Sequence, residues 1–237
     1  MRFYHFSGLV FSLVALASGS AWAEDSGFLP NYEGLTFEAD EFGGKTSPIP
    51  NITDKMATLN KIMVDQPEIF ISPDSAYKGM KPDDGTAISE ALRTAIMGNI
   101  RKENLVEEPG PNVIYLRMAI TDVHLKKKKR RLVSYTPVGL VANVAKNVVI
   151  SDMVKKIDLE KVTIEAQSIN SATGENLGTL VIRLSLAADD DSDEATWDNL
   201  TEQFDAIGKQ IACRIRNSKV VANEREDCKI LKSYREG

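Results

Sequence analysis

Apolar and polar residues alternate along several segments of the chain, and this period of two predicts β-strands. Residues 112–124 give the clearest strand, because their apolar side chains fall on every second position. The segments 161–169 and 177–186 alternate in the same way. The glycine-containing sequence 170–175 lies between them, so these two segments are predicted to form a hairpin.

A strand, a helix and another strand are predicted in the first half of the chain. Residues 61–71 predict a strand that Pro67 interrupts, which favours a sheet edge or a bulge. Residues 86–102 have apolar side chains at helical spacing, and Asp84 or Thr86 is expected to cap the first turn. The order strand, helix, strand predicts a parallel crossover.

Residues 196–217 show the most regular helical period of the chain, with apolar side chains three or four residues apart on one face. We interpret that stripe as facing a core. The elements together predict an α+β fold, a two-layer sandwich whose mixed, mostly antiparallel sheet has about four to five strands and two or three helices. This single domain is expected over residues 54–217, between an extended leader (24–53) and a polar tail (218–237).

The first 23 residues have the pattern of a secretory signal peptide. Arg2 precedes an apolar run over residues 8–17 that is too short to span a bilayer, and Ala21-Trp22-Ala23 offers small residues where signal peptidase cleaves. Cleavage is expected before Glu24. The protein is therefore predicted to be periplasmic, with no transmembrane span.

Histidine usage narrows the chemistry that one chain can perform. His5 leaves with the signal peptide, so the mature chain keeps only His124. A zinc site with two histidine ligands cannot then be built within one chain, and any Ser-His-Asp catalytic triad would have to include His124. We interpret His124 as a surface residue at a strand end. With no nucleotide-binding or hydrolase motif in the sequence, we expect no catalytic residues, no cofactor and no metal.

The chain has two cysteines, Cys213 and Cys228. In an exported protein such a pair favours a disulfide, and two free thiols are the alternative.

Six consecutive cations interrupt an otherwise acidic chain, whose formal net charge is −5. They are Lys126, Lys127, Lys128, Lys129, Arg130 and Arg131, called the basic run below. Such a run is either a solvated loop or a contact for an anionic lipid, lipopolysaccharide or an acidic protein. Nucleic acid is not expected, because export removes the protein from it and no aromatic residue interleaves the run.

Two further segments leave alternatives open. Residues 137–150 form an amphipathic helical pattern, which either packs on the core or lies on a membrane surface. Residues 189–194 are acidic apart from Ser192, and we interpret them as a solvated loop, because a calcium loop needs a glycine that this segment lacks.

Several further motifs are spread along the chain: SGFLPNYEGL (26–35), AYKGMKPDD (76–84), PGPNVIYLRMAITDV (109–123), the basic run with YTPVG (135–139), SATGE (171–175) and Trp197. Together they resemble a bacterial envelope family known as domain of unknown function 3313. The resemblance implies a secreted or lipid-anchored protein without an established activity, so no catalytic residue is carried over. Family members often have a cysteine directly after the signal, where this chain has Glu24, so lipid anchoring is not expected.

Two functions from different classes are consistent with these features. The first is a non-enzymatic periplasmic envelope protein that binds a protein partner or an anionic envelope surface. The alternative is a periplasmic hydrolase that uses paired carboxylates, since Asp and Glu are abundant and this chemistry needs no histidine.

Overall fold

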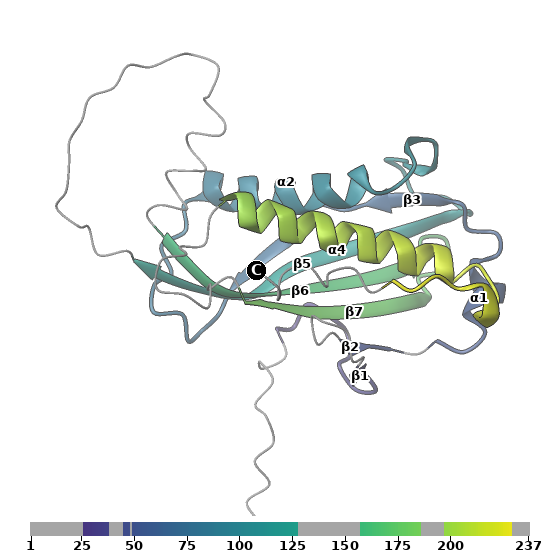
Figure 1. Ribbon diagram of the computed structural model, residues 1–237, viewed down its shortest axis with the longest axis horizontal. Coiled ribbons are helices and arrows are strands. Elements are labelled where there is room, and N and C mark those ends of the chain that lie inside the picture. The colour runs from purple at the N-terminus through teal and green to yellow at the C-terminus, as the bar shows by residue number, and fades with distance from the viewer. Residues whose placement is uncertain (1–25, 38–44, 48, 128–156, 186–196, 229–237) are drawn as a thin grey trace, which may run out of the picture.

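Helices cover one face of a single β-sheet in this protein (Figure 1). The computed structural model describes residues 26–37, 45–47, 49–127, 157–185 and 197–228. The predicted helix at 137–150 and the acidic segment 189–194 lie outside these residues.

The bounds of the described elements are as follows. The strands are β1 (Thr36–Phe37), β2 (Lys45–Thr46), β3 (Lys61–Val64), β4 (Glu68–Ile71), β5 (Val113–Lys127), β6 (Ile157–Asn170) and β7 (Asn176–Ser185). The helices are α1 (Ile52–Met56), α2 (Pro82–Gly98) and α4 (Trp197–Asn217), with short 3-10 turns η1 (Lys102–Asn104) and η2 (Ala222–Glu224).

The sheet is mixed and mostly antiparallel. Its strand order is β1-β2-β7-β6-β5-β3, and β4 also pairs with β5. Both β3 and β4 run parallel to β5, whereas the other neighbours are antiparallel. Five strands have four residues or more, and β1 and β2 add two residues each. The predicted α+β fold is therefore confirmed, as are the parallel crossover and the β6–β7 hairpin.

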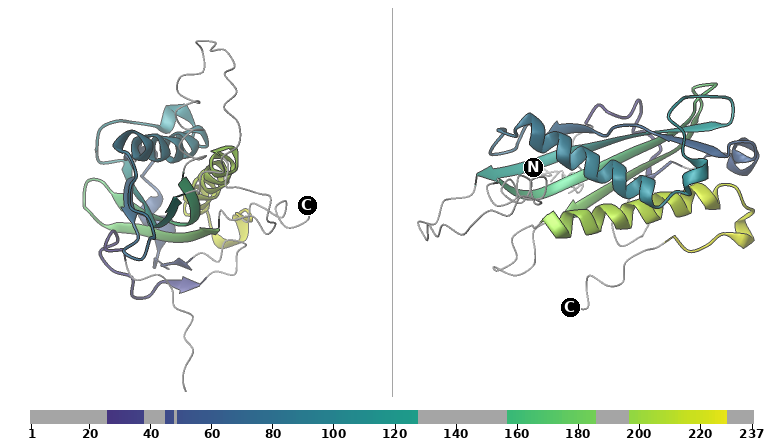
Figure 2. Two further views of the ribbon diagram at one scale, coloured as in Figure 1. Left: turned by 90° about the vertical axis from the view of Figure 1, so that its left-hand side faces the viewer. Right: turned by 90° about the horizontal axis from the view of Figure 1, so that it is seen from above.

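The main core lies between the sheet and the two long helices, which run side by side across it (Figure 2). Leu92 and Ile96 of α2 and Phe204 and Ile207 of α4 are fully buried. The apolar stripe of residues 196–217 therefore faces the core, as its spacing predicts.

The opposite face of the sheet is covered by the N-terminal leader. Phe28 and Leu29 are buried and pack with Ala119 of β5. Further along, β1 pairs with β2, and β2 pairs with β7. This leader therefore contributes to both the packing and the edge of the sheet.

Helix α2 begins four residues before the predicted start. Pro82 occupies the first turn, where its missing N–H costs no hydrogen bond. The acidic side chains of Asp83 and Asp84 stabilise this end of the helix, because the helix dipole is positive there. The predicted cap at Asp84 or Thr86 is wrong. Lys81 is the N-cap residue and makes no side-chain cap bond.

The segment 61–71 contains two strands rather than one. β3 and β4 both lie along the same side of β5, and Pro67 falls in the break between them. The Ser89 hydroxyl of α2 donates to the Pro67 carbonyl, so the break is held by the helix above it. The predicted edge position is confirmed.

A disulfide joins Cys213, near the end of α4, to Cys228, with 5.6 Å between their Cα atoms. The predicted pairing is confirmed. The bond connects the segment after α4 back to the helix.

The two long helices approach closely at Gly208 of α4. A Cβ atom built there would lie 2.7 Å from the Ala95 carbonyl oxygen of α2. This contact is with backbone, which cannot rotate away as a side chain would.

The substitution Gly208→Ala is expected to lower the free energy of unfolding by about 1–3 kcal/mol, because the helices must separate to accept the methyl group. Urea denaturation measures the change. Gly98→Ala is the matched control, since a Cβ there meets no atom within 4 Å. Equal effects of the two substitutions would contradict the close approach.

Candidate functional site

Strand β5 changes its facing pattern at a bulge near its C-terminal end. Thr121 pairs with Thr163 of β6, but the next paired residue is His124, opposite Lys161. Asp122 has a left-handed backbone (φ 49°), a conformation that aspartate tolerates better than most residues. Even-numbered residues face the helices before the bulge, and Val123 does so after it. The bulge therefore re-aims the end of the strand.

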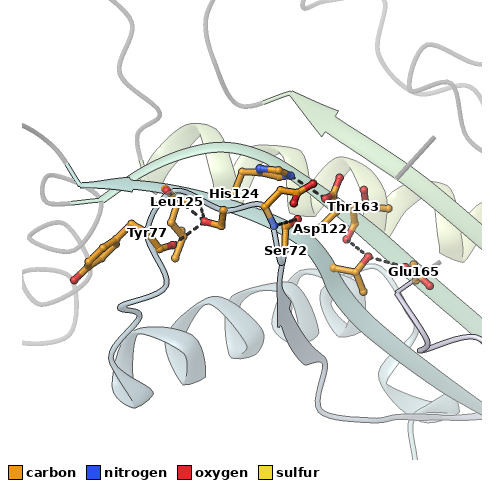
Figure 3. A network of polar contacts seen from close by, with 10 residues as sticks. Ser72, Tyr77, Asp122, His124, Leu125, Thr163 and Glu165 are labelled. Atoms are coloured by element: carbon orange, nitrogen blue, oxygen red, sulfur yellow. Dashed lines mark hydrogen bonds and ion pairs between the residues drawn. The ribbon is translucent and has the colours of Figure 1, made fainter. Parts of the chain in front are cut away.

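Asp122 and His124 are in contact at this end of β5. Asp122 Oδ1 lies 2.9 Å from His124 Nε2, and the two side chains are 19% and 26% exposed (Figure 3). His124 is at a strand end, but the interpretation from sequence considered only the neighbouring cations and missed this carboxylate. The signal was present, because residues two apart in a strand share a face. This hydrogen bond gives His124 a local structural partner.

The end of β5 is held firmly on its β4 side. The Leu125 N–H donates to Ser75 Oγ (2.8 Å), and Ser75 Oγ donates to the Tyr77 carbonyl (2.7 Å). The Tyr77 N–H in turn donates to the Leu125 carbonyl (3.1 Å). Pairing along β5 thus continues beyond β4 through the loop that leads to α2.

The other side of this strand end pairs with β6. Lys126 lies opposite Asp158, and Lys127 lies opposite Ile157. These are the first two residues of the basic run, and its other four lie outside the described residues. The run therefore begins within β5, at the end of the sheet opposite the β6–β7 turn (Figure 1).

A buried carboxylate, Glu165, lies on the leader-covered face of β6 and is only 3% exposed. The Tyr32 hydroxyl donates to Glu165 Oε2 (2.7 Å), and Thr121 Oγ1 donates to Glu165 Oε1 (2.6 Å). Burial raises the pKa of Tyr32, and its bond to Glu165 adds to the increase. A buried carboxylate is costly unless such donors satisfy it. Glu165 therefore serves as an anchor for the leader.

A second polar group fixes the leader further along the same face. The Arg117 guanidinium lies 4.7 Å from the ring centroid of Phe28 and 3.5 Å from a Glu68 carboxylate oxygen. The Phe28 ring also meets the Phe70 ring edge-on, with 6.4 Å between their centroids. These contacts combine cation–π attraction with apolar burial.

The Tyr115 hydroxyl of β5 donates a hydrogen bond to Asp65 Oδ2. Burial, followed by the bond to Asp65, raises the pKa of Tyr115 from 10.0 to about 12. The carboxylate of Asp65 thus acts as an acceptor that stabilises the protonated phenol.

No group of three or more His, Cys, Asp or Glu side chains that could hold a metal ion occurs within the described ranges. In the same part of the chain, no helix is both long enough and apolar enough to cross a bilayer.

The substitution Tyr32→Phe should lower the free energy of unfolding by about 1–3 kcal/mol, because it leaves a buried carboxylate oxygen without its donor. Urea denaturation gives the difference. The double variant Tyr32→Phe with Glu165→Gln should recover part of the loss, since the remaining group is uncharged. An unchanged stability of the single variant would refute the anchoring role of Glu165.

The stabilising contribution of Tyr115 should be lost at high pH. Its folded pKa lies above the unfolded value, so the unfolded state releases the proton first and the stabilisation disappears as pH rises from about 10 to 12. Denaturation curves of wild type and Tyr115→Phe should converge over this range. A difference that is independent of pH would contradict the assignment.

Comparison with known proteins supplies a family and a weak structural likeness. The family described as "Protein of unknown function (DUF3313)" matches residues 24–211. No curated protein matches the chain significantly. Two solved structures of PelC from Paraburkholderia phytofirmans, one of the dodecamer and one of the dodecamer of a point variant, are similar over 69% of this chain.

The likeness to the PelC structures is distant. Sequence identity is 11% for the dodecamer and 10% for the variant, with TM-scores of 0.35 and 0.34. The matched part covers 89% and 90% of the respective PelC chains. Neither likeness bears on the function of this chain. Because the family match covers most of its length, the chain belongs to the DUF3313 family of unknown function, as its motifs indicate.

Proposed function

We propose that this protein is a non-enzymatic protein of the bacterial periplasm that docks on an anionic envelope surface through the basic run. The observation that carries the proposal is the position of the first two cations, Lys126 and Lys127, at the end of β5. Hydrogen bonds hold that end from both sides, through pairing with β6 and through Ser75 Oγ and the Tyr77 N–H of the loop after β4. The backbone of Lys126 and Lys127 is therefore held in place by the sheet.

Export is supported by the signal-like N-terminus together with the Cys213–Cys228 disulfide. Disulfides form and persist in oxidising compartments such as the periplasm. With no cysteine at position 24, we propose that the mature protein carries no lipid and depends on peripheral contact to reach the envelope.

The contacts of three carboxylates, those of Glu165, Asp65 and Asp122, favour binding over hydrolysis. Glu165 accepts hydrogen bonds from two hydroxyl groups under the leader, and Asp65 accepts one from the Tyr115 hydroxyl. Asp122 pairs with His124. A hydrolytic pair needs two carboxylates that a substrate can reach, and Glu165 is almost wholly covered. These acids have structural partners, so we do not adopt the hydrolase alternative.

The expected chemistry of docking is Coulombic. Each Lys or Arg close to an anionic membrane contributes about 1 kcal/mol, and salt weakens the contribution because the Debye length is only about 8 Å at physiological ionic strength. Phosphate is the shared recognition group of phosphatidylglycerol and lipopolysaccharide.

Sedimentation of the mature protein with phosphatidylglycerol vesicles at low salt tests the proposal. Lys129→Gln with Arg130→Gln should weaken binding about 30-fold, the equivalent of about 2 kcal/mol. Changing all six cations to Gln should abolish it. Arg101→Gln with Lys102→Gln is the matched control, an exposed adjacent pair of cations after α2, and should change binding little.

Vesicles that contain lipopolysaccharide in place of phosphatidylglycerol distinguish the two phosphate sources. Absence of binding to both vesicle types at low salt would contradict surface docking. The function would then have to be sought in a protein partner.

A further inference from the structure

The structure contains a cavity of about 670 Å³ between the C-terminal half of α4 and the sheet. It lies towards the disulfide end of α4, whereas β5 ends with Lys126 and Lys127 at the other end of the sheet (Figure 1). Its volume is within the range of roughly 300–1,000 Å³ that is usual for sites of small molecules.

Small residues in the sheet create this space. On the helix-facing side of the β6–β7 ladder, Ile164 pairs with Ile182 in the middle of the sheet. Further along the same ladder, Ser168 pairs with Gly178. Both small residues line the cavity, and a Cβ on Gly178 would meet no atom within 4 Å. The volume that isoleucines fill elsewhere is therefore open beneath α4.

The inner walls of the cavity are apolar. Met56 of α1, Leu116 of β5, Ala166 of β6 and Ile211 of α4 line it, and each is almost fully buried. An apolar chain placed against these side chains would leave water, which is favourable by about 0.8 kcal/mol per methylene, or about fourfold in affinity.

The other end of the cavity is polar and carries more positive than negative charge. Arg214 of α4 and Arg225 of the following segment line it, with Asp227 as the one carboxylate among the described residues of its walls. Arg225 and Asp227 are exposed, so this end faces solvent. Arginine is always charged at neutral pH, and its planar fork suits carboxylate and phosphate groups.

One wall is formed by the segment that the disulfide connects to α4. The Asn217 side chain donates to the Glu226 carbonyl (2.8 Å) and accepts from the Glu226 N–H (2.9 Å). The disulfide between Cys213 and Cys228 joins the end of the same segment to α4, and Cys228 lines the cavity. This wall is therefore fixed to the helix at two adjoining places.

From the cavity, its apolar interior and its cationic opening, we propose that this protein binds a single-chain amphiphile with an anionic head group. The chain lies beneath α4 against Leu116 and Ala166, and the head group lies near Arg214 and Arg225. This site is separate from the proposed docking surface, and binding here does not depend on the basic run.

Calorimetry with decanoate, dodecanoate and tetradecanoate below their micellar concentrations tests the site. We use mature protein in which the six cations of the basic run are changed to Gln, at physiological salt. Affinity should rise about fourfold for each added methylene. Dodecyltrimethylammonium, of equal chain length and opposite charge, should bind at least tenfold more weakly than dodecanoate. Equal affinity for the two head groups, or no dependence on chain length, would overturn the proposal.

The substitution Gly178→Phe fills the cavity and should abolish dodecanoate binding. Gly98→Phe is the matched control, because a Cβ there also meets no atom within 4 Å and the residue lies at the end of α2, outside the cavity lining. A folded Gly178→Phe protein that binds dodecanoate as wild type does would overturn the proposal.

Photo-cross-linking of unsubstituted protein with a diazirine-labelled fatty acid provides a test that is independent of any variant. The label should be recovered on peptides that contain Met56 or residues 210–215. Recovery only at other positions would refute the site.

Discussion

The antiparallel ladder between β5 and β6 is the constraint on which the rest of the structure depends. These are the two longest strands, and every other layer is built against them. On one side β5 also receives β3 and β4 in parallel, and on the other side β6 receives β7. The helices pack on one face of this ladder, and the leader packs on the other. Both faces of the sheet are therefore covered. The helix face is packed by apolar side chains, and the leader face includes the hydrogen bonds of Glu165.

Much of the fold could be predicted from the sequence because its signals are local. The period of two over residues 112–124 and the period of three to four over 196–217 each come from a single face in contact with the core. The start of α2 is harder to predict, because Pro82 and Gly85 are typical of turns. Proline is nevertheless well tolerated in a first helical turn. Pro67 indicated an edge, but whether one strand or two followed depended on contacts with α2.

The site features were harder to predict because they join residues far apart in the chain. Tyr32 and Glu165 are separated by 133 positions, and nothing near either residue indicates the other. The polar side chains of Thr163, Glu165 and Gln167 suggest a face in contact with solvent, whereas all three are buried in the structure. The cavity likewise arises from Ser168 and Gly178 only once the register of β6 and β7 is known. By contrast, Asp122 and His124 lie two residues apart in a strand, and their contact could have been inferred.

The two ends of the molecule have different chemistry. One end combines the bulge at Asp122 with the start of the basic run, and the other combines an apolar cavity with the disulfide. Hydrogen exchange of the mature protein with and without phosphatidylglycerol vesicles tests surface docking most directly. Docking through the basic run predicts added protection in peptides that contain residues 120–131, with no change around residues 100–110. Unchanged exchange at 120–131 under conditions where the protein is bound to the vesicles would contradict it.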